Sequence, residues 1–533
     1  MPSHGAMPTG GLRPGAGARE IARVSHNPAA VSLHPGEPEA PTGIAKAAQI
    51  AGGTLGTVLY VIAITGAGMA LPHMQGAFSA APDQIAWVVT GFIVAAAMTN
   101  ACAGWLANRI GRRRLFLICI AGFTASSAAC GLAESLETAV LARMFQGAFG
   151  APLSPLGQAI AVDAWPRRSQ AKGTTVWSMG ALWGGFVAPL AGGFLTEYQG
   201  WPWVFLMVVP LGIVTFFVAW YAVPEGGERS RAHMDWIGFL TLVLSIGAFM
   251  YGLSRGERLD WFASGEIVAA MTLASLAFYL FVIRMATARR PFMPLGLFAD
   301  RNYTVAMLFM FVYSLNNYLP LFVLPIVMTG VMNLTLPVIG MLLATRSFGA
   351  FASMLVVMPL ADRVDGRVWL IVGFTALMAP VWMMSRWGVD PSWTGIVLAM
   401  FLQGFGSAMP YIGISAMAFA TLPGELRTQG MSLMHLINNL GVAIAAAAVF
   451  SLLTREIQSS RSVLRQFASP YNEALHSGVG RGQIDLSRAS DLASLGAEIG
   501  RQAMMVAFNS TFQIIAYAGL VVLPLMLFAR VRR

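Results

Sequence analysis

Long apolar runs separated by short polar turns fill the chain from about residue 50 onward. Each run holds about 20 residues, which is enough for an α-helix to cross a hydrocarbon core of roughly 30 Å. The pattern therefore predicts an all-α membrane protein with fourteen transmembrane helices. Their expected spans are 50–72, 85–107, 115–133, 138–161, 173–195, 203–223, 236–255, 266–286, 302–327, 336–358, 368–386, 394–420, 430–454 and 505–529.

Composition supports a polytopic membrane protein, because 56% hydrophobic and 11% charged residues cannot form a water-soluble surface. The net charge of +10 is carried almost wholly by arginine in the turns, so nucleic acid is not an expected partner. Cys102, Cys119 and Cys130 lie in or beside apolar runs without metal-ligand spacing. We expect these cysteines to be small core residues. No metal site, cofactor or disulfide framework is expected.

The basic residues favour alternate connections, which orients the chain. A bilayer resists burying arginine, and cytoplasmic loops carry an excess of it. The loops at 73–84 and 329–336 are nearly bare, and only Arg255 and Arg258 depart from the pattern. With an even number of helices, both termini are expected in the cytoplasm. The membrane that the helices cross is expected to be the cytoplasmic (inner) membrane. The basic connections contain Arg112, Arg113 and Arg114; Arg167, Arg168 and Lys172; Arg229 and Arg231; Arg289, Arg290 and Arg301; Arg363 and Arg367; Arg427; and Arg530, Arg532 and Arg533.

Two polar segments flank or interrupt the helices. Residues 1–48 are rich in Pro, Gly and Ala and lack an apolar stretch suited to a signal peptide, so we predict a disordered cytoplasmic tail. Residues 455–504 form a long polar segment that we predict as an external loop with helix-compatible pieces.

A glycine-punctuated basic turn occurs twice, which indicates an internal repeat. The first copy reads GWLANRIGRRRL over Gly104 to Leu115, and the weaker second copy reads MPLADRVDGR over Met358 to Arg367. Aligning them gives two six-helix halves at 49–224 and 301–533, with an inserted two-helix hairpin at 225–300. Transporters build two such halves around a central site.

The basic turn resembles the signature loop of the major facilitator superfamily. Gly104, Arg109, Gly111 and Arg112 occupy the family's positions, whereas Asn108 stands where the family has an acidic residue. In the second copy, Asp362 and Arg363 match the same loop. The resemblance implies that these residues control the conformational change, and the alternative is a basic turn that only anchors topology.

Two further helices carry similar motifs. LARMFQGAFGA, from Leu141 to Ala151, resembles the family's fourth-helix motif, with Arg143 and Gln146 on matching positions. Arg143 either reaches the near membrane surface or faces an aqueous cavity, and we expect the cavity. In the fifth helix, Gly184, Pro189 and Gly193 resemble the antiporter motif of exporters, for which ordinary tight helix packing is the alternative.

Longer stretches are similar to the fourteen-helix drug:proton antiporter branch. The resemblance implies a secondary transporter, not an enzyme, that exports lipophilic or amphipathic drug-like molecules by alternating access with proton coupling. It also implies a small organic substrate and a periplasmic adaptor protein as partners. The stretches are WPWVFLMVVPLG at 201–212, LATRSFG at 343–349, FATLPGELRTQG at 419–430 and RQAMMVAFNSTF at 501–512.

The chain departs from that branch where the branch carries charge. Ala63 replaces an aspartate of the first helix, and Asn438 and Ser510 replace an arginine and an aspartate near the end. No carboxylate lies deep in any predicted helix, so His435, with an unperturbed pKa near 6.5, is the remaining candidate to carry a proton. The alternative role of His435 is a packed hydrogen-bonding residue. An uncoupled or substrate-specific transporter, or a sensor or scaffold that has lost transport, is the alternative function.

Other polar residues inside the apolar runs complete the expected transport cavity. His435, Asn438 and Asn439 share one helix face by their spacing. Asn316 and Asn317 precede Pro320 and Pro325, so we expect that helix to be broken and its unwound backbone to line the cavity. Thr65 is the polar residue that the first helix retains from its motif.

Overall fold

The structure is a computed structural model that describes residues 43–166, 170–225, 235–288, 291, 293, 296–357, 359–360, 364–422, 426–467 and 488–524. The tail expected at 1–48 lies outside these ranges except for residues 43–48, which already belong to the first helix. Every regular element in the described ranges is a helix, so the all-α prediction is confirmed. Thirteen of these helices are long and apolar enough to cross a membrane.

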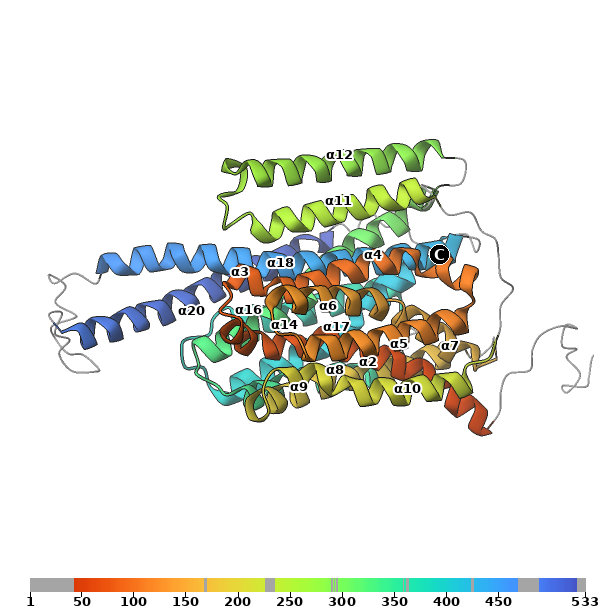
Figure 1. The fold of residues 1–533 in the computed structure, drawn as a ribbon, viewed down its shortest axis with the longest axis horizontal. Coiled ribbons are helices and arrows are strands. Elements are labelled where there is room, and N and C mark those ends of the chain that lie inside the picture. The colour runs from red at the N-terminus through yellow and green to blue at the C-terminus, as the bar shows by residue number, and fades with distance from the viewer. Residues whose placement is uncertain are drawn as a thin grey trace, which may run out of the picture. The chain divides into compact units, whose positions relative to one another are not determined.

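The helices follow the chain in the predicted order (Figure 1). The first group is α2 (Gly43–Ala77), α3 (Pro82–Ile85), α4 (Trp87–Ile110), α5 (Arg112–Gly131), α6 (Leu136–Gly150), α7 (Leu153–Asp163), α8 (Gln170–Tyr198), α9 (Pro202–Leu206) and α10 (Val208–Ala222). The middle group is α11 (Trp236–Arg255), the short 3-10 helix η2 (Trp261–Ala263), α12 (Gly265–Thr287) and α13 (Gly296–Ala299). The last group is α14 (Arg301–Gly330), α15 (Leu336–Val357), α16 (Gly366–Met384), α17 (Trp393–Ala420), α18 (Arg427–Phe467) and α20 (Ala489–Val521).

The fourth predicted span, 138–161, corresponds to α6 and α7 together, which a turn at Ala151 and Pro152 separates. Pro152 has no backbone N–H, and it caps the start of α7 while Ala151 closes α6. Taken together, α6 and α7 supply one crossing, and the other thirteen helices bring the total to the expected fourteen.

The segment predicted as an external loop is helical over much of its length. Helix α18 continues to Phe467 and α20 begins at Ala489, while residues 468–487 lie outside the described part. These two helices contact one another and run side by side in Figure 1 beyond the ends of their neighbours.

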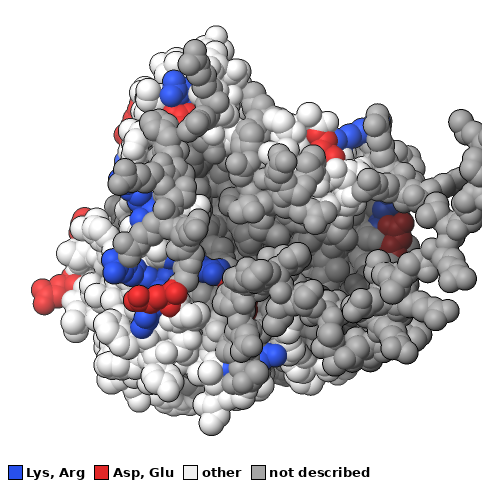
Figure 2. All heavy atoms as spheres, turned by 90° about the vertical axis from the view of Figure 1, so that its right-hand side faces the viewer, with Lys and Arg blue, Asp and Glu red and all other residues white. Residues whose placement is uncertain are grey.

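The turn at Gly111 defines one end of the helix bundle, which we call the basic end. Helix α4 stops at Ile110 and α5 starts at Arg112, and Gly111 joins them with a φ of 100°, which favours glycine. Arg112 forms an ion pair with Asp163 at the end of α7, and Arg113 Nη1 lies 3.1 Å from Glu225 Oε1. Figure 2 looks onto this end and shows basic side chains next to acidic ones. The opposite end, where α2 ends and α4 begins, is the far end.

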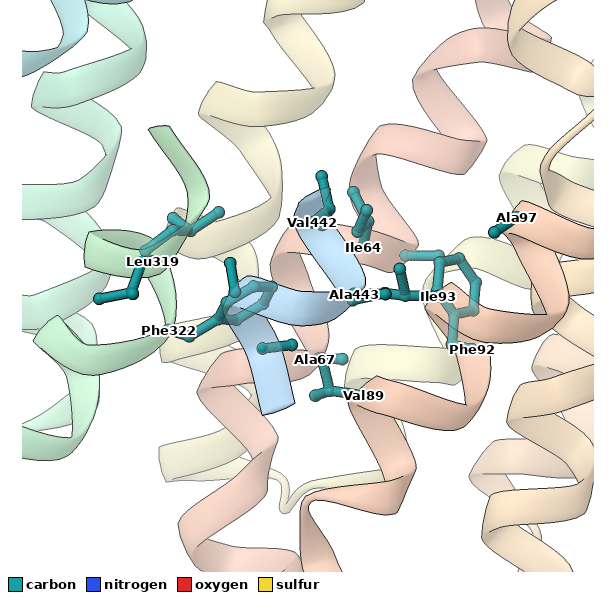
Figure 3. Close-up of a cluster of buried hydrophobic side chains, with 14 of the residues drawn as sticks. Ile64, Ala67, Val89, Phe92, Ile93, Ala97, Leu319, Phe322, Val442 and Ala443 are labelled. Carbon is teal, nitrogen blue, oxygen red and sulfur yellow. The ribbon is translucent and has the colours of Figure 1, made fainter. Parts of the chain in front are cut away.

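The first and last groups of helices meet mainly through two pairs of helices. Helix α4 packs against α18, and α8 packs against α15. Figure 3 shows apolar side chains from four helices converging between the groups. They are Ile64 and Ala67 of α2, Val89, Phe92 and Ile93 of α4, Leu319 and Phe322 of α14, and Val442 and Ala443 of α18. On α4 these residues belong to the half of the helix near the far end.

Helix α14 is continuous from Arg301 to Gly330, so the predicted break near Pro320 and Pro325 is wrong. A proline inside a helix removes one N–H and one backbone hydrogen bond, and close packing against neighbouring helices can hold the helix together. Most of the residues on α14 are buried against such neighbours, including Pro320 and Pro325 themselves.

Candidate functional site

Arg143 lies on α6 with no exposed surface. Its Nε donates to the carbonyl oxygen of Val88 at 2.9 Å, and its Nη1 donates to Gln146 Oε1 at 2.5 Å and to the carbonyl oxygen of Ala63 at 3.3 Å. The guanidinium carbon stacks 4.1 Å above the ring of Phe92. The side chain therefore does not extend to a membrane surface, and in this conformation it is covered by protein rather than exposed to an aqueous cavity.

Gln146 connects Arg143 to α5. Its Nε2 donates to Ser127 Oγ at 2.6 Å while its Oε1 accepts from Arg143. The hydrogen-bond partners of Arg143 among the described residues are all neutral, and its Nη2 has no hydrogen-bond partner there. An arginine buried in this way keeps its positive charge without a local carboxylate, which is costly in a membrane interior.

A second arginine centre lies in the last helix group and was missed by sequence reasoning. Arg346 on α15 donates from Nε to Gln403 Oε1 at 2.7 Å and from Nη2 to Asn317 Oδ1 at 2.6 Å. Asn317 was predicted for the cavity, and the structure brings it to Arg346. Its neighbour Asn316 instead donates to the Val312 carbonyl of its own helix, and Asn316 Oδ1 is buried without a partner in the described ranges.

An internal repeat around Gln146 and Gln403 could have revealed this second centre. The segment from Leu141 reads LARMFQG and the segment from Leu398 reads LAMFLQG. In each copy the glycine after the glutamine lets a neighbouring backbone approach. A Cβ on Gly147 would lie 2.1 Å from the Phe92 carbonyl oxygen, and one on Gly404 would lie 1.7 Å from the Arg346 carbonyl oxygen. Phe92 and Arg346 thus occupy corresponding packing positions.

The remaining predicted cavity residues do not gather in one place. Asn438 Oδ1 accepts from Ser314 Oγ at 2.8 Å, and Asn439 is buried on the same helix. His435 Nε2 is buried and has no hydrogen-bond partner within the described chain. Thr65 donates to the carbonyl of Val61 at 2.7 Å within its own helix. In the described residues, no three His, Cys, Asp or Glu side chains gather as metal ligands would.

The residues expected to control conformation fall into two groups. At the basic end, Gly104, Asn108 and Arg109 are exposed on α4, and a Cβ added to Gly104 would touch nothing within 4 Å. Asp362 and Arg363 of the second copy lie outside the described residues. The first copy of the motif therefore makes no close packing contact at Gly104 in this conformation.

The glycine motif of α8 lies between two helices. Gly184 faces α2, where its Cβ would lie 3.1 Å from the Val58 carbonyl oxygen. Gly193 faces α15, where its Cβ would lie 2.4 Å from the Leu336 carbonyl oxygen, and the carbonyl oxygen of Pro189 lies equally close to a Cβ built on Gly340. The α8–α15 contacts at these positions are backbone to backbone and lie in the part of each helix near the far end.

Comparison with known sequences agrees with this architecture. Residues 53–299 and 306–464 match the Major Facilitator Superfamily. The fatty acid resistance protein FarB of Neisseria gonorrhoeae is 26% identical over 480 residues, which cover 89% of this chain and 94% of that protein. The multidrug export protein EmrB of Escherichia coli K12 is 27% identical over 489 residues, which cover 90% and 94%.

Solved structures show the same fold at lower identity. A bacterial homolog of the human lysosomal transporter Spinster is 17% identical with a TM-score of 0.58, and the match covers 92% of this chain and 100% of that one. The xylose transporter XylE from E. coli is 11% identical with a TM-score of 0.56, and the match covers 91% and 98%. The predicted fold class is thereby confirmed.

Proposed function

This chain belongs to the Major Facilitator Superfamily, and on that premise we propose that it exports lipophilic or amphipathic organic molecules across the cytoplasmic membrane by alternating access. Two of its relatives are named a fatty acid resistance protein and a multidrug export protein, and amphipathic organic substrates fit both names. The exporting halves are residues 49–224 and 301–533, with the α11–α12 hairpin, within residues 225–300, inserted between them.

The two ends of the helix bundle differ, and this difference is the main support for alternating access. Near the far end the halves are in contact through Gly193 and Leu336 and through the apolar cluster around Val89. Toward the basic end, Gly104 and Asn108 on the same helix α4 are exposed. A transporter that is closed on one side and open on the other has this asymmetry. If the arginine-rich turns are cytoplasmic, the structure represents an inward-facing state.

The neutral surroundings of Arg143 bear on proton coupling. The antiporter branch that this sequence resembles carries an aspartate at position 63, whereas here the Ala63 backbone carbonyl accepts from Arg143. No carboxylate in the described spans forms an ion pair with Arg143. If transport is coupled to protons, we propose that His435 carries the proton. Its Nε2 has no hydrogen-bond partner in the described part of the chain. The helical extensions of α18 and α20 at the far end provide a surface for the adaptor protein that we propose as partner.

Single cysteines at the two ends test alternating access. In a background without Cys102, Cys119 and Cys130, Gly104→Cys should react with a membrane-impermeant thiol reagent at rest, because its side chain would meet open space. Val89→Cys should react slowly, because Val89 is 1% exposed. Adding a transported amphiphile should slow labelling at 104 and accelerate it at 89. Labelling rates that do not respond in opposite directions to any amphiphile would support the alternative of a scaffold that keeps the fold without transport.

A further inference from the structure

We propose that the exported molecule is an amphipathic anion, such as a long-chain carboxylate, and that Arg346, Gln403, Tyr318 and Tyr411 bind its charged group. This inference rests on the proposed function, and it names a substrate class and a binding site within the transporter. It follows from the hydrogen-bonding capacity that these side chains leave unused, from their charge, and from their position between the two halves.

The polar side chains around Arg346 present more donors than acceptors. Gln403 is fully buried, and its Oε1 accepts from Arg346, but its Nε2 donor has no partner among the described residues. Arg346 uses Nε and Nη2 for Gln403 and Asn317, and no bond is formed by its Nη1 within the described ranges. A buried donor without an acceptor is costly, and a ligand that brings acceptor atoms would relieve that cost.

Tyrosine hydroxyls enlarge this cluster. The ring centroids of Tyr313 and Tyr411 lie 6.2 Å apart, and Tyr318 and Tyr313 interact electrostatically with Arg346. The Tyr313 hydroxyl donates to the Ser407 carbonyl at 3.0 Å, whereas those of Tyr318 and Tyr411 form no hydrogen bond inside the described chain and are partly exposed. The Tyr318 hydroxyl is therefore available near the guanidinium, and the Tyr411 hydroxyl belongs to the same group of tyrosines.

The charge of this cluster is uncompensated. Arg346 forms no ion pair with any described residue, since its partners are the amide groups of Gln403 and Asn317 and the Asn317 backbone carbonyl. A guanidinium in a low-dielectric interior attracts a carboxylate or another oxyanion strongly, and its planar donors match the two oxygens of a carboxylate. A cationic substrate would instead meet a like charge here.

Arg346 is better placed than Arg143 to receive a ligand. Arg143 has no exposed surface and is covered by Phe92, whereas Arg346 is partly exposed. The next residue, Ser347, donates to the carbonyl oxygen of Gly185 on α8 at 2.7 Å, which places this turn of α15 at the contact between the halves. A ligand held here would therefore be affected when the halves move.

Apolar surface begins directly beside the polar cluster. On α14 the residue after Tyr318 is Leu319, which with Phe322 belongs to the apolar cluster between the halves (Figure 3). Leu319 and Phe322 are buried where the halves meet, so they would be uncovered beside Arg346 when the halves separate. An alkyl chain would then lie along these side chains while its anionic group binds the guanidinium, which is the arrangement that an amphipathic anion requires.

Binding of three ten-carbon probes to the full-length protein in lipid nanodiscs tests the assignment: decanoate, decyltrimethylammonium and decanol. We expect decanoate to bind most tightly. Arg346→Gln should weaken decanoate binding roughly 10- to 100-fold, the equivalent of losing hydrogen bonds from a charged group, while decanol binding changes little. Arg386→Gln is the matched control, because Arg386 is an exposed arginine that stacks on Trp382 at 4.4 Å near the far end.

Introducing a negative charge at the same place gives an independent readout. Gln403→Glu would set a carboxylate against Arg346 Nε, so decanoate binding should fall and decyltrimethylammonium binding should rise. Tyr411→Phe, which removes only a hydroxyl, should weaken decanoate binding by a few-fold and serves if Arg346→Gln does not fold.

The proposal is overturned if the wild type prefers decyltrimethylammonium, or if folded Gln403→Glu and Tyr411→Phe proteins both keep wild-type affinity for decanoate. Liposome flux of the three probes separates this failure from failure of the proposed function. Flux of the cation or the alcohol with no decanoate preference would reject the anion site and retain the exporter. Absence of flux for all three probes would reject the exporter, and with it the anion site as a substrate site.

Discussion

The guanidinium of Arg143 donates to the backbone carbonyl oxygen of Ala63 across the contact between α6 and α2, at 3.3 Å. A backbone carbonyl bears only a partial charge, so this contact leaves the positive charge of Arg143 without a full counterion. The resemblance to the drug:proton antiporter branch implies a carboxylate at the position of Ala63, so this pair of residues is where we expect the chain to depart from that branch.

If a carboxylate is restored at residue 63, the stability of that variant should depend on the side chain at residue 143. Ala63→Asp is expected to fold, because Arg143 is within reach as a counterion. In an Arg143→Gln background the same aspartate would be buried unpaired, at a cost of about 3–5 kcal/mol. Thermal unfolding in detergent of the two single variants and the double variant measures the coupling. Additive shifts would show that residue 63 does not pair with Arg143.

His435→Gln should flatten the response of flux to an imposed pH gradient if His435 carries the coupled proton. The probe is decanesulfonate, an anion that stays charged at all relevant pH values, so that protons carried by the substrate do not contribute. Asn438→Gln serves as the control on the same helix, because Asn438 bonds to Ser314 and does not titrate. A full pH response in His435→Gln would remove this residue from the coupling mechanism.

Binding of a carboxylate substrate should depend on pH in a second way, because the substrate itself titrates. Decanoate is charged above the pKa of its carboxyl group, which is about 4–5 by analogy with glutamate, and neutral below it. Binding at Arg346 should therefore be strong at neutral pH and decline as the pH falls through that range. Decanesulfonate binding, measured in parallel by the same method, should stay constant. Equal declines for both ligands would attribute the pH effect to the protein.

Sequence periodicity predicted the helices well because a membrane span needs a long apolar run, and such runs are visible without any tertiary information. It did not reveal the turn at Pro152 that divides one span, and it wrongly predicted a break near Pro320, where packing kept the helix whole. The motif identified Arg143 and Gln146. Arg346 was overlooked because its partners, Asn317 and Gln403, are 29 and 57 residues away in the chain, and only the fold brings them together.

Gly193→Ala should open the far end. Its new Cβ would lie 2.4 Å from the Leu336 carbonyl oxygen, and overpacking of this kind costs about 1–3 kcal/mol. Because that cost applies only while α8 and α15 are in contact, the equilibrium should move toward separation and Val89→Cys should label faster. Gly68→Ala is the control, since its Cβ would meet nothing within 4 Å. Equal labelling in both variants would show that Gly193 does not control the far end.

Asn108→Asp should shift the resting population toward the state closed at the basic end. The signature loop that this turn resembles has an acidic residue at this position, and a charge that faces a helix terminus contributes about 0.3–1 kcal/mol, or a factor of about 2 to 5. Labelling of Gly104→Cys should slow by that factor, and Asn108→Gln should leave it unchanged. Unchanged or faster labelling in Asn108→Asp would indicate that the turn only anchors topology.

Whether this protein exports an amphipathic anion is measured by flux through the purified protein. Liposomes containing the wild type are loaded with labelled decanoate, and its release is followed with and without a pH gradient, beside Arg143→Ala and the exposed control Arg386→Ala. We expect saturable release by the wild type and by Arg386→Ala. A folded Arg143→Ala protein should lose release, because the contacts that join α2, α4 and α6 through this side chain are removed. Release by Arg143→Ala at the wild-type rate, or wild-type release no faster than from protein-free liposomes, would contradict this expectation.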